Sequence, residues 1–249
     1  MVKALVLCGG EGKRLRPLTY YFQKTMIPIG IKQKPLLEYI IRLLRHHQIR
    51  DVTLLVGYKA EQIKNYFEDG TRFNVNVSYS VDVPELKGTG GSILKALVNG
   101  DIDDDDQIIV YYGDIVSNIN LTDLIEQHIN KKAMATVALA TGYALPVGVA
   151  QTRDDNRIIG FVEKPNYEKP VSIGILAIKG KALRYLKELS TTHEALDIMG
   201  HLIPHLIEQG ESVYGYTLNS FWCDIGTTER YEKLDNEEID RIFNFLMLD

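Results

Sequence analysis

Val2-Lys3-Ala4-Leu5-Val6-Leu7-Cys8, followed by Gly9-Gly10-Glu11-Gly12-Lys13-Arg14-Leu15-Arg16-Pro17-Leu18-Thr19, is the stretch that decides the fold. The first seven residues are almost continuously apolar, which is typical of a strand buried on both faces. Glycines directly after such a strand let backbone N–H groups approach a phosphate closely, because no Cβ intervenes. The pattern predicts a phosphate-binding turn; the plain alternative is a strand-to-helix turn with solvated charges.

Two familiar phosphate-binding motifs do not fit this turn. A dinucleotide fingerprint requires a third small residue where Leu15 stands, and Pro17 opposes the prompt start of a helix. A P-loop requires Ser or Thr after Gly-Lys, where this chain has Arg14. What remains is a turn rich in cations: Lys13, Arg14, Arg16 and, further on, Lys24.

Strand and helix patterns alternate over residues 2–112. We expect strands at 2–8, 52–56, 75–81 and 108–112, and helices from Pro35, at 60–67 and at 92–98. This alternation predicts a doubly wound α/β sheet. The second half reads as more antiparallel, with strands at 134–140, 147–152, 157–163 and 171–178 and helices at 181–189, 194–209 and 228–247.

Composition excludes several classes of protein. The chain has 249 residues, 45% of them hydrophobic and 24% charged, as in ordinary globular proteins. No apolar run approaches the roughly 20 residues of a membrane helix, and a net charge of −5 argues against a nucleic-acid surface. Cys8 and Cys223 give no disulfide framework or metal knuckle, so we expect them to pack in the core. A cytoplasmic protein is expected.

The turn also resembles a family signature. Together with Lys24, Met26 and Pro28 it is similar to the motif of the sugar-1-phosphate nucleotidyltransferases, with Lys13 in place of threonine and Thr25 in place of proline. Loss of that proline is expected to loosen the loop that presents Lys24. Further matches follow in family order: Gly57-Tyr58-Lys59-Ala60-Glu61-Gln62-Ile63, Gly88-Thr89-Gly90-Gly91, Gly113-Asp114, Gly148-Val149, Glu163-Lys164-Pro165, Ser172-Ile173-Gly174-Ile175 and Trp222-Cys223-Asp224-Ile225-Gly226-Thr227.

The resemblance implies a fold and a reaction. The fold is a Rossmann-like nucleotide-diphospho-sugar transferase with a mixed central sheet and helices on both faces. We expect a single domain over 1–249, with a nucleotide-binding half at about 1–115, a sugar-phosphate-binding half at about 116–249 and no C-terminal β-helix. The reaction joins a nucleoside triphosphate and a sugar 1-phosphate, giving a nucleotide-sugar and pyrophosphate.

The resemblance assigns roles to individual residues. Arg14 and Lys24 would be catalytic, and Asp114 and Asp224 would hold Mg²⁺, although a lone Asp after a strand is also a common turn residue. The nucleotide-binding residues would be Leu7, Gly9, Gly10, Gly12, Arg14, Tyr58, Gly88 and Thr89. The sugar-phosphate-binding residues would be Gly148, Glu163, Lys164 and Ser172; here Ser172 replaces an asparagine, and Val147 an aromatic residue.

The motifs that carry the resemblance predict the reaction more directly than they predict the base and the sugar. The chain most resembles guanylyltransferases that act on mannose or manno-heptose 1-phosphate; thymidylyl- and uridylyltransferases acting on glucose 1-phosphate are the alternatives. A non-catalytic regulatory relative that binds nucleotide-sugars is a reading from another class, which the presence of the charged residues disfavours. We expect neither a nucleic acid nor a membrane as a partner. The sequence is compatible with a homo-oligomer.

Overall fold

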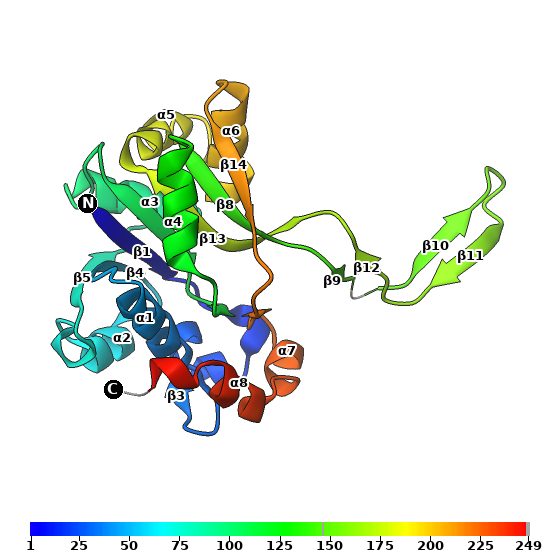
Figure 1. Cartoon of the computed structure of the whole chain (residues 1–249), viewed down its shortest axis with the longest axis horizontal. Helices are drawn as coiled ribbons and strands as arrows, with labels where there is room; N and C mark the ends of the chain where they lie inside the picture. The colour runs from blue at the N-terminus through cyan, green and yellow to red at the C-terminus, as the bar shows by residue number, and fades with distance from the viewer. Residues whose placement is uncertain (146, 248–249) are drawn as a thin grey trace.

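The computed structural model describes residues 1–145 and 147–247 (Figure 1). Its centre is a seven-stranded sheet in the order β14-β8-β13-β6-β1-β4-β5. β1 pairs in parallel with β4 and β6, whereas β13 runs antiparallel to β6 and β8, so the sheet is mixed. The strands are β1 (Val2–Cys8), β4 (Asp51–Val56), β5 (Asn76–Val81), β6 (Gln107–Tyr112), β8 (Ala135–Ala140), β13 (Val171–Lys179) and β14 (Val213–Thr217).

Helices cover both faces of this sheet, because successive residues of a buried strand point to opposite sides. Ala4 and Val6 of β1 belong to one apolar core, and Leu5 belongs to the other. The first core contains residues of α1 (Leu36–His46), α2 (Ala60–Phe67) and α4 (Leu121–Asn130). The second contains residues of α3 (Gly88–Val98), α5 (Tyr185–Leu189) and α6 (Ile203–Glu208). The expected α/β fold class is confirmed.

Short elements complete the chain. The remaining strands are β2 (Pro28–Ile29), β3 (Lys34–Pro35), β7 (Ile115–Ser117), β9 (Tyr143–Ala144), β10 (Val149–Thr152), β11 (Ile158–Val162), β12 (Asn166–Tyr167) and β15 (Trp222–Asp224). The remaining helices are α7 (Thr228–Glu232) and α8 (Asn236–Ile242), single 3-10 turns at Lys13–Leu15, Leu18–Tyr20, Lys24–Met26, Thr71–Phe73, Gly180–Arg184 and Asn244–Leu246, and a π-helical turn at Ile198–Leu202.

Three sequence expectations are wrong in detail. The helix expected over 228–247 is interrupted, because the Asp235 side chain accepts hydrogen bonds from the backbone N–H groups of Glu237 and Glu238 and begins a new helix, α8. α3 begins at Gly88, four residues before the expected start at Ser92. The helix expected over 194–209 begins only at Ile198, with its π-helical turn.

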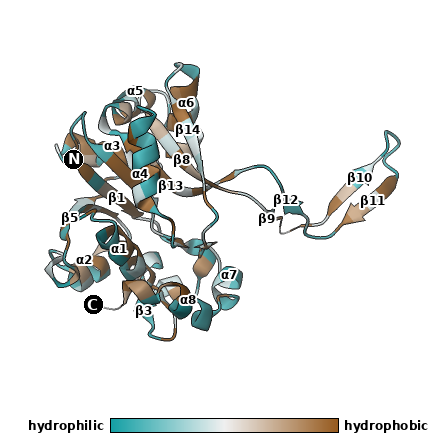
Figure 2. Cartoon of the chain, in the orientation of Figure 1, coloured by the Kyte–Doolittle hydropathy of each residue, from teal (hydrophilic) through white to brown (hydrophobic). Residues whose placement is uncertain are grey.

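Residues 141–145 and 147–170 form an arm that projects from the body (Figure 1). β9 and β12 pair at its base and β10 and β11 form its outer hairpin. Apolar side chains of the hairpin are exposed, Phe161 by 61%. Figure 2 colours much of β11 brown because its residues are hydrophobic. Among the described residues, no helix is both long and apolar enough to cross a membrane.

Candidate active site

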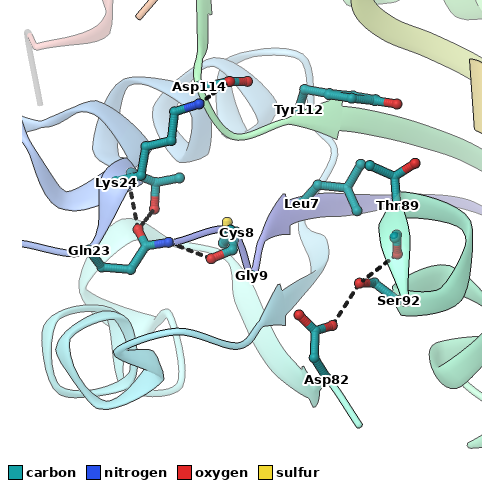
Figure 3. Close-up of a pocket in the computed structure, with 13 residues that line it drawn as sticks. Leu7, Cys8, Gly9, Gln23, Lys24, Asp82, Thr89, Ser92, Tyr112 and Asp114 are labelled. Atoms are coloured by element: carbon teal, nitrogen blue, oxygen red, sulfur yellow. Dashed lines mark hydrogen bonds and ion pairs between the residues drawn. The ribbon is translucent and has the colours of Figure 1, made fainter. Parts of the chain in front are cut away.

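A cavity of about 360 Å³ lies at the carboxyl ends of the parallel strands (Figure 3). Ligands of open α/β sheets bind at this edge, where the strand order reverses. Here β4 and β6 flank β1 on opposite sides, so the reversal falls beside β1. Seven residues predicted from sequence line the cavity: Leu7, Gly9, Gly10, Lys24, Gly88, Thr89 and Asp114.

The glycine-rich turn contributes Gly9 and Gly10 to the lining of the cavity. Gly12 has a φ of 62°, a left-handed conformation that favours glycine. A Cβ at this position would lie 2.9 Å from Cγ2 of Thr19 and 3.1 Å from Cβ of Lys24, so the turn packs against the segment that carries Lys24. Gly10 faces open space, as a site for an approaching ligand requires.

Hydrogen bonds hold the Lys24 loop where the family has a proline. The amide of buried Gln23 donates to the carbonyl of Cys8, and its oxygen accepts from the backbone N–H and the hydroxyl of Thr25. Thr25 is itself buried, and Lys24 beside it forms an ion pair with Asp114. Polar contacts therefore restrain the loop that the sequence expectation described as loosened.

Asp114 and Asp224 lie close together, as the resemblance implied. β7 and β15 pair antiparallel, and the backbone N–H of Ile225 donates to the carbonyl of Asp114 over 2.9 Å. Burial and the neighbouring charge of Asp114 raise the pKa of Asp224, while Arg230, Lys24 and Arg14 oppose that rise. Oδ1 of Asp224 is buried without a hydrogen-bond partner among the described residues.

A second cavity of about 440 Å³ joins the first at Tyr112 and Asp114. Its lining includes Ser172, predicted from sequence, and also Asp224. The rings of Tyr143 and Trp222 stack in its wall with centroids 6.1 Å apart. Such an amphipathic aromatic wall, beside carboxylates and an arginine, suits a polar ring such as a sugar.

Some predicted residues lie outside both cavities. Arg14 is exposed on its 3-10 turn, but it is close enough for its charge to oppose the rise in the pKa of Asp224. Tyr58 packs against the signature segment, its hydroxyl donating to the carbonyl of Thr19. Gly148 and Glu163 adjoin one another on the arm, away from the second cavity.

Lys164 also belongs to the arm but lies near its base. It has a φ of 49°, and its charge contributes to the lowered pKa of Glu229 on α7. Thr89 lines the first cavity, but its hydroxyl donates to Asp197 and accepts from the backbone N–H of Ile198. The hydrogen bonds of the Thr89 side chain therefore link α3 to the π-helical turn.

Sequence reasoning missed several residues of these cavities. Arg230 on α7 pairs with Asp224 and donates to the hydroxyl of Tyr143. Thr227, at the start of that helix, accepts from the backbone N–H of Arg230; this Thr-x-x-Arg spacing was the available signal. Asp82 also lines the first cavity. The only sequence signal for it was a polar residue directly after a strand, β5.

Both cysteines are free thiols, as expected for residues without a disulfide framework. Cys8 is buried and Cys223 is half-buried, and burial raises the pKa of each thiol. Neither is therefore activated as a thiolate. Among the described residues, no group of three or more His, Cys, Asp or Glu side chains is placed to hold a metal ion.

A family model described as nucleotidyl transferase matches residues 3–241 of the chain. The chain belongs to this family. The nucleotidyl transferase is 32% identical over 238 residues to the D-glycero-alpha-D-manno-heptose 1-phosphate guanylyltransferase of Aneurinibacillus thermoaerophilus, covering 95% of this chain and 98% of that protein. It is 32% identical over 245 residues to the UTP–glucose-1-phosphate uridylyltransferase of Synechocystis, with 92% of this chain matched but only 61% of the relative's length spanned.

Solved structures share the fold of this nucleotidyl transferase. A putative glucose-1-phosphate thymidylyltransferase of Bacillus anthracis, solved with sucrose, superposes with a TM-score of 0.77 at 23% identity, covering 98% of this chain and 99% of that one. HddC of Yersinia pseudotuberculosis, solved with GMP-PN, superposes with a TM-score of 0.72 at 21% identity, covering 96% and 99%.

Proposed function

We propose that this nucleotidyl transferase joins a nucleoside triphosphate to a sugar 1-phosphate, releasing pyrophosphate. The observation that carries the proposal is the meeting of two cavities at Asp114, with Lys24 and Asp224 at the junction. A reaction between two anionic substrates requires adjacent sites and cationic groups between them.

The chemistry is a direct transfer. An oxygen of the sugar phosphate attacks the α-phosphorus in line, forming a new P–O bond. The bond from the α-phosphorus to the bridging oxygen breaks, and pyrophosphate leaves with that electron pair. The protein contributes positioning and neutralisation of charge, as in other phosphoryl transfers.

Lys24 and Arg14 are the proposed catalytic residues. Lys24 already lies at the junction, so its ammonium can exchange the carboxylate of Asp114 for an oxygen of the α-phosphate. The exposed guanidinium of Arg14 can grip the triphosphate tail bidentately. Removing one such stabilising group costs about 3–4 kcal/mol of barrier in comparable sites.

The residues at the junction fit a magnesium ion. Two carboxylates, one with a buried oxygen lacking a hydrogen-bond partner among the described residues, are a hard-oxygen donor set. Mg²⁺ is usually held by one or two carboxylates together with water and substrate phosphates. Asp114 and Asp224 would hold it, and the ion would neutralise charge on the phosphate oxygens.

The sugar phosphate is proposed to lie in the second cavity. Ser172 lines it, and the stacked rings of Tyr143 and Trp222 offer a surface to the sugar. Lys164, near α7, would pair with the phosphate, while Glu163 and Gly148 would contact the sugar from the arm. Residues 1–115 would thus bind the nucleotide, and residues 116–249 would complete the sugar-phosphate site within one domain.

We propose GTP and mannose or manno-heptose 1-phosphate as the substrates. The near full-length match to a relative named as a manno-heptose 1-phosphate guanylyltransferase supports this pair. Glucose 1-phosphate with UTP or dTTP is the second candidate, supported by the uridylyl- and thymidylyltransferases among the relatives. Synthesis of such a nucleotide-sugar fits a cytoplasmic enzyme.

The test is pyrophosphate release across GTP, UTP, dTTP, CTP and ATP against several sugar 1-phosphates, with Mg²⁺ and with a chelator. Release confined to Mg²⁺ and to GTP with mannose or manno-heptose 1-phosphate is the expected result. Release with another pair would replace the substrate assignment. No release from folded protein that binds nucleotide-sugars, seen as thermal shifts, would favour a regulatory relative instead.

A further inference from the structure

Asp82 projects a carboxylate into the first cavity from the end of β5 (Figure 3). Its Oδ1 accepts a hydrogen bond from the hydroxyl of Ser92 on α3 over 2.7 Å. Its Oδ2 occupies the space above two glycines. A Cβ would lie 2.0 Å from this oxygen at Gly9 and 2.6 Å from it at Gly57. Glycine at both positions therefore makes room for the carboxylate.

No cation among the described residues compensates the charge of this carboxylate. Within residues 1–145 and 147–247, Ser92 is its only hydrogen-bond partner and no ion pair reaches it. Burial raises the pKa of Asp82, opposed only by the hydrogen bond from Ser92. Asp82 lines the cavity, and its Oδ2 has no hydrogen bond among the described residues. Such a half-buried carboxylate is a strong acceptor for a ligand that brings N–H donors.

The position of Asp82 indicates which part of a nucleotide it meets. Figure 3 shows Asp82 and the Lys24–Asp114 pair at opposite ends of the cavity. β5 lies two strands from β1 on one side, whereas β6, which precedes Asp114, lies on the other. A triphosphate is drawn to Lys24 and repelled by an unpaired carboxylate. The uncharged base is therefore directed toward Asp82.

We propose that Asp82 is a specificity residue that reads the base and selects guanine, an inference that rests on the proposed function of this site. Guanine presents two adjacent donors on one edge, its N1–H and its exocyclic N2 amino group. The two oxygens of a carboxylate accept both at once. Oδ1 retains capacity for this in addition to Ser92, because a carboxylate offers about four acceptor positions.

The other bases match the carboxylate less well. Uracil and thymine have one donor, N3–H, flanked by two carbonyl oxygens that would face the negative charge. Adenine and cytosine each place a ring-nitrogen acceptor beside their amino group. A buried acceptor left facing an acceptor costs affinity, so each of these bases is disfavoured relative to guanine.

The experiment measures binding of GTP, XTP, UTP, dTTP and ATP by calorimetry, without sugar phosphate, to wild-type protein and to Asp82→Asn. Xanthine carries an oxygen where guanine carries the N2 amino group, so the asparagine amide can donate to it. We expect the wild type to bind GTP best. Asp82→Asn should weaken GTP binding by roughly 10- to 100-fold, the size of one bidentate base contact, and should bind XTP more tightly than the wild type does.

Glu85→Gln is the matched control, because Glu85 is an exposed acid in the same connection and its change removes the same charge. It should leave all five affinities unchanged. Wild-type protein that binds triphosphates without preferring GTP would overturn the role of Asp82 but leave the proposed function standing. The role of Asp82 would also be overturned if Asp82→Asn weakened the binding of all five triphosphates equally, as expected for a contact to ribose. A folded wild type that binds no triphosphate would overturn the proposed function itself.

Discussion

Asp114 and Asp224 face one junction although they lie far apart in the sequence, because β7 and β15 pair and Ile225 donates its N–H to the carbonyl of Asp114. Each carboxylate has a cationic neighbour, Lys24 for Asp114 and Arg230 for Asp224. The arrangement leaves one buried oxygen of Asp224 without a hydrogen bond among the described residues. Each carboxylate of the site is thus paired with a cation, but one carboxylate oxygen keeps an acceptor position that no described residue uses.

Replacing Asp224 with asparagine should stabilise the protein and abolish its activity. The folded-state pKa of Asp224 is raised, so the folded protein favours the protonated form and ionisation lowers stability as pH rises through that pKa. The variant's higher Tm should therefore appear at neutral pH and shrink in acid. Each kcal/mol gained corresponds to about 2–4 °C at this size. Thermal melts at neutral and acidic pH check it; a lower Tm at neutral pH would contradict it.

Lys24→Met should lower kcat by about 100- to 1,000-fold, the usual loss for one group that stabilises developing charge. The fold should persist, because methionine retains most of the packing volume of the lysine chain. Lys24→Arg should recover part of the rate. Steady-state kinetics with both substrates saturating give the comparison, and an unchanged kcat in the methionine variant would remove Lys24 from the reaction.

Gly9→Ala and Gly10→Ala should differ although they are neighbours. A Cβ at Gly9 meets Oδ2 of Asp82 at 2.0 Å, whereas a Cβ at Gly10 meets nothing within 4 Å. Gly9→Ala should lower the Tm, and Gly10→Ala should leave it unchanged in the free protein. Equal Tm values for the two variants would show that Asp82 moves away at no cost.

Lys164→Ala should raise KM for the sugar 1-phosphate by roughly tenfold, the loss of one charge-assisted hydrogen bond of about 1.5 kcal/mol. KM for the triphosphate should stay constant, since the nucleotide is assigned to the other cavity. Lys169→Ala, an exposed lysine on the same arm, is the control for charge. Equal effects of the two substitutions on KM would indicate general attraction rather than a contact by Lys164.

Local patterns were sufficient for much of the fold. The strand Val2–Cys8 and the helix Ala60–Phe67 have the bounds that their apolar spacing predicted. The helix at 121–130 was missed, although Asn120 caps it and Leu121, Leu124 and His128 face the core. The prediction of one long C-terminal helix was wrong, because it followed the apolar periodicity and did not consider Asp235 as the N-cap of a separate helix.

The site was predictable only where a motif carried it. Lys24 and Asp114 line the cavity with the glycine turn, and Asp224 adjoins them in the second cavity. The Thr-x-x-Arg spacing marks the start of the helix that carries Arg230, but it does not place that helix beside the cavities. Asp82 reaches the first cavity through strand order, which no local spacing encodes. The projection of the arm, whose strand β11 ends just before Glu163, is not encoded in local spacing either.

The most direct test of the account is a crystal structure with the nucleotide-sugar product bound. We expect the diphosphate at the junction, with Lys24 on its α-phosphate and Asp114 and Asp224 on either side. The base should lie toward Asp82 and the sugar against Trp222. A third cavity of about 710 Å³, lined by Arg14 and Lys233, adjoins the second one at Asp224. A diphosphate bound there, away from Lys24 and Asp114, would contradict the assignment of the junction as the site of transfer.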